Sequence, residues 1–135
     1  MIIQVNKEHH ISQARLAVRR LAGEIGFRQV ATYYVATSVT ELANNLFFHT
    51  TQGGTISLAA LRTNGKIGIE IIAEDQGPGI PDVKLAMQDD FSTNGGLGGG
   101  LPGVERLMDE FEITSTVGVG TWVVARKWQP AMIEQ

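Results

Sequence analysis

Two polar side chains on one predicted helix have the residue types and the spacing to do chemistry. Glu41 and Asn45 stand four residues apart in the stretch ELANN, within an apolar pattern of helical period. Residues four apart on a helix share a face, so the carboxylate and the amide oxygen can reach one point. Such a pair suits a hard divalent cation, or a general base beside a magnesium ligand. A solvated helix face is the alternative interpretation of these two residues taken alone.

A second polar stretch, EDQGPGIPD at residues 74–82, follows an apolar segment that we expect to be a buried strand. Asp75 therefore stands at the carboxyl end of that strand, where ligand clefts of sheet proteins commonly lie. Its carboxylate can accept a hydrogen bond from an exocyclic amine such as that of adenine. Gly77 and Gly79 would let a flat ring approach the backbone. A proline–glycine turn capped by an aspartate is the alternative here.

The third stretch, FSTNGGLGGGLPG at residues 91–103, is rich in glycine and precedes a helix predicted to start near Pro102. Successive backbone N–H groups without side chains, leading into a helix N-terminus, form a site for phosphate. The stretch is not a Walker loop, because GxxxxGK[ST] is absent, and no buried strand leads into it as in a Rossmann fingerprint. Ser92 and Thr93 either contact a bound phosphate or cap the turn.

The composition limits the class of protein that can carry these motifs. With 135 residues, 43% of them apolar and 19% charged, the sequence is typical of one globular domain. A net charge of -3 gives no electrostatic footprint for nucleic acid, and the lack of cysteine excludes disulfides and thiolate metal sites. No apolar run is long enough to cross a bilayer, and no signal-peptide pattern is present. We therefore expect a cytoplasmic protein that binds neither nucleic acid nor membrane.

The elements that must position the motifs follow from the hydrophobic periodicity. Apolar residues at helical spacing predict helices over residues 8–24, 29–48, 82–88 and 102–110. Alternation and glycine turns predict strands over residues 2–5, 55–63, 66–75, 111–117 and 120–128. The strand over residues 66–75 is apolar on both sides, which indicates a central, covered strand. We expect Trp122 and Trp128 to lie in the core.

The grouping of these elements predicts an α+β fold: a two-layer sandwich of one mixed β-sheet with helices packed on one face. We expect a single domain over residues 1–135, with its core over about residues 8–128 and a frayed tail after that.

In their order and spacing, the three motifs resemble the signature of the GHKL superfamily (gyrases, heat-shock chaperones, histidine kinases and MutL proteins), which has the Bergerat ATP-binding fold. That signature is an N box with Glu and Asn on a helix, a D-x-G-x-G box after a strand, and a G-x-G-x-G-L box before a helix. The chain supplies ELANN, then DQGPG at residues 75–79, then GLGGGL at residues 96–101. The resemblance covers roughly residues 8–128.

The resemblance implies ATP and Mg²⁺ as cofactors and a role for each matching residue. Glu41 would be the catalytic base and Asn45 the magnesium ligand, whereas Asn44 departs from the arginine often found before the N-box asparagine. The helical spacing from Glu41 favours Asn45 over Asn44 as that ligand. The residues implied at the nucleotide, including a threonine on the last hairpin, are Asn45, Asp75, Gly77, Gly79, Ser92, Thr93, Gly96, Gly98, Gly99, Gly100, Leu101 and Thr121.

Within the superfamily, the stretches AEDQGPGIPD, FSTNGGLGGGLPGV and RLMDEF look most like the small bacterial serine kinases that switch stressosome-type signalling modules. This resemblance implies phosphorylation of a serine or threonine on STAS-domain antagonist and scaffold proteins, and activation of a downstream phosphatase or cyclase. One alternative is an anti-sigma factor kinase, whose protein-binding surface could include Arg15, Arg19 and Arg20. Another is a nucleotide-gated binding module that sequesters a partner with little phosphotransfer.

Overall fold

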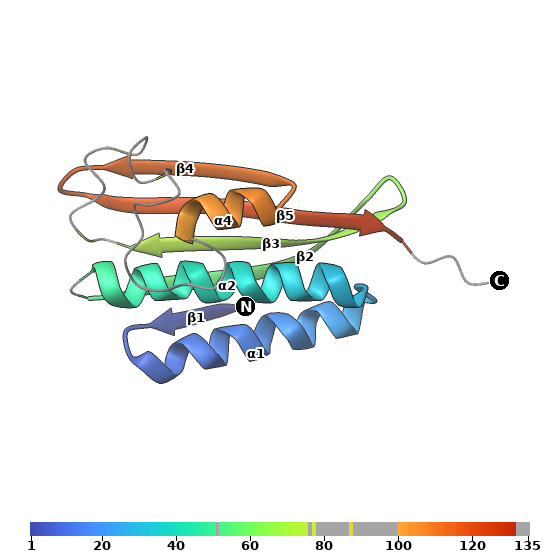
Figure 1. Ribbon diagram of the computed structural model, residues 1–135, viewed down its shortest axis with the longest axis horizontal. Helices are drawn as coiled ribbons and strands as arrows, with labels where there is room; N and C mark the ends of the chain where they lie inside the picture. Colours follow the sequence, from blue (N-terminus) through green and yellow to red (C-terminus); the bar gives the residue numbers. More distant parts are fainter. Residues whose placement is uncertain (51, 76, 78–86, 88–99, 132–135) are drawn as a thin grey trace.

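Five strands and three helices make up the part of the chain that the computed structural model describes, namely residues 1–50, 52–75, 77, 87 and 100–131. Figure 1 shows the strands as one sheet with the helices on one face, so the predicted two-layer α+β fold is confirmed. The elements in chain order are β1 (Ile2–Val5), α1 (Glu8–Ile25), α2 (Gln29–His49), β2 (Gly54–Thr63), β3 (Lys66–Asp75), α4 (Gly100–Leu107), β4 (Glu110–Thr116) and β5 (Gly120–Pro130).

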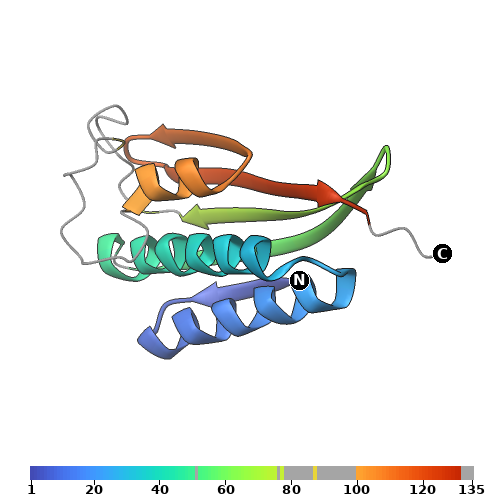
Figure 2. The same cartoon turned by 45° about the vertical axis from the view of Figure 1, so that its right-hand side comes forward.

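The sheet has the strand order β1-β2-β3-β5-β4, and every neighbouring pair of these strands is antiparallel. The prediction of a mixed sheet is therefore wrong. Strands β3 and β4 do run in the same direction, but the β4–β5 hairpin inserts β5 between them, so they share no ladder (Figure 2). The arrangement leaves β3 at the centre of the sheet, as the sequence predicted, and β1 at an edge.

The core lies between β3 and α2. On β3, the side chains that face the helices are buried: Ile67, Ile69, Ile71 and Ala73. On α2, the predicted apolar stripe is buried against them: Val35, Val39, Leu42 and Leu46. Each fully buried side chain of this size contributes roughly 1.5–3 kcal/mol to stability. Since α2 also packs between α1 and α4 (Figure 1), it is held on three sides.

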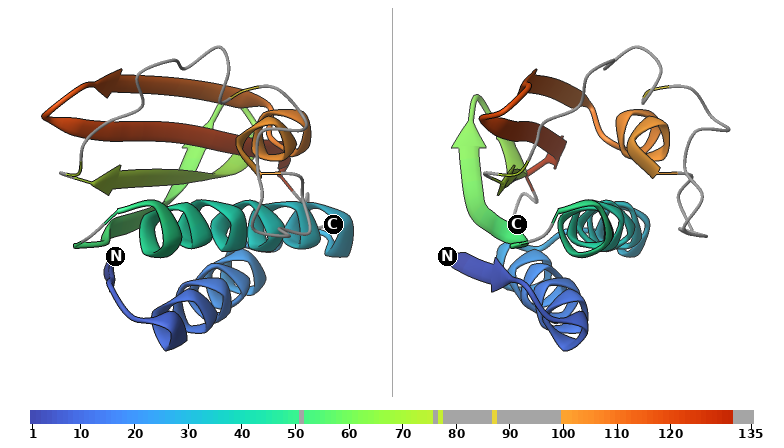
Figure 3. Two further views of the ribbon diagram at one scale, coloured as in Figure 1. Left: turned by 60° about the vertical axis from the view of Figure 1, so that its left-hand side comes forward. Right: turned by 90° about the vertical axis from the view of Figure 1, so that its left-hand side faces the viewer.

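No described helix covers the other face of the sheet (Figure 3). Trp128 lies over Gly68, where an added Cβ would come within 2.6 Å of the indole ring. Arg126 Nε donates a hydrogen bond to Glu70 at 2.8 Å, and this bond raises the pKa of Arg126. Because no described helix covers this face, Trp122 is 39% exposed, and its predicted place in the core is wrong.

Two predicted boundaries also need correction. Helix α4 covers residues 100–107 instead of 102–110, because Glu110 already pairs with Arg126 in the sheet. Strand β5 continues through Pro130, so the frayed tail does not begin at residue 129. The Gln129 side chain accepts a hydrogen bond from Arg28 N at 2.9 Å and donates one to Gly26 O at 3.0 Å, which fixes the end of the strand.

The predicted helix over residues 82–88 lies outside the described residues except for Met87, which is in a turn. None of the helices that the structure does describe is long and apolar enough to cross a membrane.

Ser38 provides a test of the packing between α2 and the sheet. It is 0% exposed, and its hydroxyl has no hydrogen-bond partner among the described residues. A buried hydroxyl left unpaired costs roughly 1–3 kcal/mol. We therefore expect Ser38→Ala to raise the free energy of unfolding by about 1–2 kcal/mol in a urea titration.

The matched control is Ser12→Ala on the exposed side of α1, which loses only a long, exposed contact from Arg15 at 3.4 Å besides the gain in helix propensity, and should add only about 0.5 kcal/mol. A gain no larger than that for Ser38→Ala would mean that the buried hydroxyl carries no penalty.

Candidate functional site

Asp75 lies at the carboxyl end of β3 and is held there by two backbone donors. Its Oδ1 accepts a hydrogen bond from Gly77 N at 2.8 Å and a longer one from Thr121 N at 3.4 Å. The first bond closes the turn after the strand, and the second joins the carboxylate to the start of β5. Within the described part of the chain both bonds go to Oδ1, so Oδ2 keeps its lone pairs for a further donor.

Thr121 and Ser115 extend this polar group across the last hairpin. They pair directly between β4 and β5, and their hydroxyl oxygens are 3.0 Å apart. The sequence motifs predicted Thr121 at the site but missed Ser115. The glycines at residues 118 and 120 that fix the hairpin were the available signal, because its register places Ser115 opposite Thr121.

Glu41 and Asn45 lie one turn apart on α2, as the spacing predicted. Glu41 is only 2% exposed, whereas Asn44 and Asn45 are both half-buried, so burial does not distinguish the two asparagines. Glutamate is rarely buried to this degree unless it is paired or has a specific role. The burial of Glu41 therefore argues against the solvated helix face.

The C-terminal end of α2 contacts the turn that follows Asp75. A Cβ added to Gly77 would lie 3.1 Å from Asp75 Oδ1 and 3.4 Å from Thr50 Cβ. Thr50 is fixed in turn by a hydrogen bond from its hydroxyl to Leu46 O at 2.7 Å. Thr50 is not part of any motif in the sequence, and no local pattern distinguishes it from any other residue that ends a helix. This contact connects the helix that carries Glu41 to the strand that carries Asp75.

Of the residues predicted to bind phosphate, the structure describes those that begin α4. Gly100 and Leu101 are both buried there, in a helix that packs against α2. The remaining predicted nucleotide residues lie outside the described part of the chain: Gly79, Ser92, Thr93, Gly96, Gly98 and Gly99.

The side-chain oxygen atoms that α2 offers suit a cation that keeps most of its ligands as water or phosphate oxygens. The described residues contain no group of three or more His, Cys, Asp or Glu side chains that could hold a metal ion. Asn45 offers one amide oxygen, with the Glu41 carboxylate one turn away. Mg²⁺ commonly keeps several waters and binds phosphate oxygens beside one or two protein ligands, so this sparse set suits it.

Comparisons with known proteins agree with this geometry. Residues 3–127 match the family model described as the histidine kinase-like ATPase domain. The chain is 47% identical over 126 residues to the serine/threonine-protein kinase RsbT of Bacillus subtilis (strain 168), covering 93% of this chain and 94% of that protein. It is 33% identical over 129 residues to an anti-sigma F factor of Caldanaerobacter subterraneus subsp. tengcongensis, covering 92% and 89% of the two chains.

Solved structures whose sequences have low identity to this chain have the same fold. The RsbU and RsbW domains of Rv1364c from Mycobacterium tuberculosis match with a TM-score of 0.65 at 18% identity, over 100% of this chain and 34% of that longer one. The mycobacterial sensor histidine kinase MprB matches with a TM-score of 0.56 at 18% identity, over 98% and 99% of the two chains. These matches confirm the GHKL-type fold predicted from the motifs.

A substitution at Gly54 tests the close approach of β2 and β3 that positions Asp75. Gly54 and Asp75 pair across the two strands, and a Cβ on Gly54 would overlap the Glu74 carbonyl oxygen and lie 2.8 Å from Leu46 Cδ2. Because a backbone oxygen cannot rotate away, we expect Gly54→Ala to lower the free energy of unfolding by about 1–3 kcal/mol in denaturant titrations.

Gly23→Ala is the matched control, since nothing lies within 4 Å of the added Cβ in α1. It should be neutral or stabilise by up to about 1 kcal/mol. Wild-type stability of Gly54→Ala would show that the two strands do not need this close approach.

Proposed function

Because the chain belongs to the histidine kinase-like ATPase domain family, we propose that it is an ATP-dependent serine/threonine-protein kinase of a bacterial partner-switching module. The observation that carries the proposal is the buried Glu41 on α2, in a fold where Asp75 ends the central strand. A module that only bound nucleotide would need Asp75 but would have no use for a buried carboxylate beside Asn45. The 47% identity to the kinase RsbT supports the same activity.

The nucleotide takes its adenine contacts from the end of the sheet. The adenine amine donates to Asp75, with Gly79 and Thr121 beside it. The bonds from Gly77 and Thr121 to Asp75 Oδ1 fix the carboxylate before ATP arrives, so little ordering remains at binding. The phosphates meet the backbone N–H groups of residues 98–101, where α4 begins.

Transfer then depends on the two side chains of α2. Glu41 accepts the proton of the incoming serine or threonine hydroxyl. The hydroxyl oxygen forms a bond to the γ-phosphorus of ATP, and the bond from that phosphorus to the ADP oxygen breaks. Asn45 would hold Mg²⁺, which would supply charge neutralisation at the phosphates when bound. Because the core fixes α2 against the sheet, both side chains keep their orientation, and catalysis of this kind depends mainly on such positioning.

The proposed substrates are STAS-domain antagonist and scaffold proteins of a stressosome-type module in the cytoplasm. The released kinase then activates a downstream phosphatase or cyclase. An anti-sigma factor kinase is the second candidate, favoured by the 33% identity to an anti-sigma F factor.

Incubation with labelled ATP, Mg²⁺ and STAS-domain proteins should place label on serine or threonine of one of them. Tight binding of a sigma factor would instead favour the second candidate.

Replacing Asp75 tests the adenine contact. In Asp75→Asn, the charge is lost and an amide donor can face the adenine amine, so we expect ATP affinity to fall by at least about 100-fold in calorimetric titrations. The control is Asp109→Asn, at the opposite end of β5, where the Asp109 carboxylate accepts a bond from Trp128 N at 2.8 Å. That control should bind ATP normally. Undiminished binding by Asp75→Asn would refute the adenine assignment.

Replacing Glu41 tests the proton transfer. Glu41→Gln keeps the volume of the buried side chain but cannot accept the hydroxyl proton, so we expect phosphotransfer to fall by about 10²–10⁴-fold. ATP affinity should stay within about twofold of wild type, because the effect belongs to the chemical step. The control is Glu112→Gln on an exposed position of β4, which should leave both quantities unchanged. Wild-type transfer by Glu41→Gln would exclude Glu41 as the base.

A further inference from the structure

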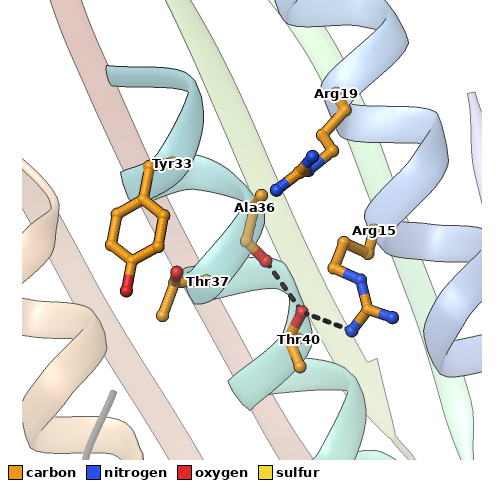
Figure 4. Close-up of a pocket in the computed structure, with 6 residues that line it drawn as sticks. All are labelled: Arg15, Arg19, Tyr33, Ala36, Thr37 and Thr40. Atoms are coloured by element: carbon orange, nitrogen blue, oxygen red, sulfur yellow. Dashed lines mark hydrogen bonds between the residues drawn. The ribbon is translucent and has the colours of Figure 1, made fainter. Parts of the chain in front are cut away.

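A groove between α1 and α2 presents two arginine side chains on the surface of the helical layer. Its volume is about 230 Å³. Figure 4 shows Arg15 and Arg19 reaching from α1 toward Ala36 and Thr40 of α2, with the strands of the sheet passing behind both helices. Six residues line the groove, none of them in the candidate site described above: Arg15, Arg19, Tyr33, Ala36, Thr37 and Thr40.

Among the described residues, no carboxylate forms an ion pair with either arginine. Ion pairs in the described part of the chain involve Arg126 and Lys127, and neither Arg15 nor Arg19 has an acidic partner there. Within the described residues, the hydrogen bonds of the Arg15 side chain are long contacts to hydroxyl oxygens, at 3.4 Å to Ser12 and 3.5 Å to Thr40. Like charges one helical turn apart repel each other. An anion in the groove would relieve that repulsion and satisfy the guanidinium donors.

The guanidinium donors of Arg15 and Arg19 suit a ligand with several acceptor oxygens. The Thr40 hydroxyl donates to Ala36 O at 2.9 Å, so its own hydrogen is used. The hydroxyl groups of Tyr33 and Thr37 lie on the other side of Ala36 from the two arginines (Figure 4). A phosphate monoester brings three terminal oxygens and a charge of about -1.5 to -2, which matches two arginines. A carboxylate brings one charge and would leave the second arginine unbalanced.

Exposed apolar side chains beside the groove indicate a protein ligand over a free ion. Leu16 precedes Arg19 by three residues and is 62% exposed, and Val30 precedes Tyr33 by three and is 63% exposed. Residues at this spacing are neighbours on a helix surface. A polypeptide in the groove would cover them, whereas a lone phosphate would not.

We propose that this groove binds the phosphoryl group of a phosphorylated serine or threonine on a protein partner. The inference rests on the proposed function, because a protein kinase of this class produces that group on its partners. Ala36 and Glu41 are five residues apart on α2, about 7.5 Å along the helix axis. A partner held by its phosphate in the groove therefore lies beside the turn that carries the proposed base, and the kinase distinguishes partners that are already phosphorylated.

The experiment is an NMR titration of ¹⁵N-labelled protein with a short peptide that carries one phosphoserine. Saturating ADP fills the nucleotide site, so that phosphate cannot bind there. We expect amide shifts confined to residues 12–20 and 30–40. Arg15→Gln and Arg19→Gln should each weaken binding by at least about tenfold, as loss of a charge-assisted contact does. The control Arg20→Gln removes the same charge from an exposed position of α1 outside the groove, and should change affinity by less than about twofold.

Three outcomes would overturn the inference. The first is equal binding of the matching peptide with aspartate in place of phosphoserine, which would make the groove a carboxylate site. The second is an equal loss of affinity in Arg20→Gln, which would indicate general charge attraction. The third is inorganic phosphate binding as tightly as the peptide, which would show that the polypeptide of a protein partner contributes nothing to binding. If ADP fails to bind, the proposed function fails, but the same titration without nucleotide still tests the groove.

Discussion

The packing of α2 on the central strand β3 is the contact on which the other features depend. Val39 and Leu42 on the helix and Ile69 and Ile71 on the strand are all 1% exposed or less. The same helix carries Glu41, Asn45 and four of the six groove residues, while the same strand ends at Asp75. Burial at this contact therefore sets the relative position of the proposed base, the adenine contact and the groove. A shift of α2 would move Glu41, Asn45 and the α2 side of the groove relative to Asp75, which the bonds from Gly77 and Thr121 hold at the end of β3.

Local patterns in the sequence predicted local structure well. Both long helices are within one residue of their predicted ends, and the β2–β3 turn has the positive φ values of 49° at Asn64 and 76° at Gly65 that its sequence required. Strand order was harder, because hairpins specify pairs and leave open where a hairpin joins the sheet. Trp122 was misplaced for a related reason: hydrophobicity does not reveal which face of a sheet lacks a second layer.

The residues of the candidate site also differ in whether a local pattern in the sequence could reveal them. Glu41 and Asn45 could be found from helical spacing, and Asp75 from its place after an apolar strand. Thr50 could not, because its role is a contact with Gly77, which is far away in the sequence. The arginines of α1 show the limit most clearly. The sequence grouped Arg15, Arg19 and Arg20 as one surface, but the structure places only the first two in the groove, beside α2 residues that no pattern in α1 specifies.

The hydrogen bonds of the Gln129 side chain have a consequence for the order in which the parts of the fold form. It bonds to the backbone of residues 26 and 28, so the connection between the first two helices is completed by the last described strand. That strand also lies between β3 and β4, which means that the sheet stays open until it arrives. Contacts this distant in sequence form late and slowly. Completion of the sheet therefore depends on β5, the last of the described strands.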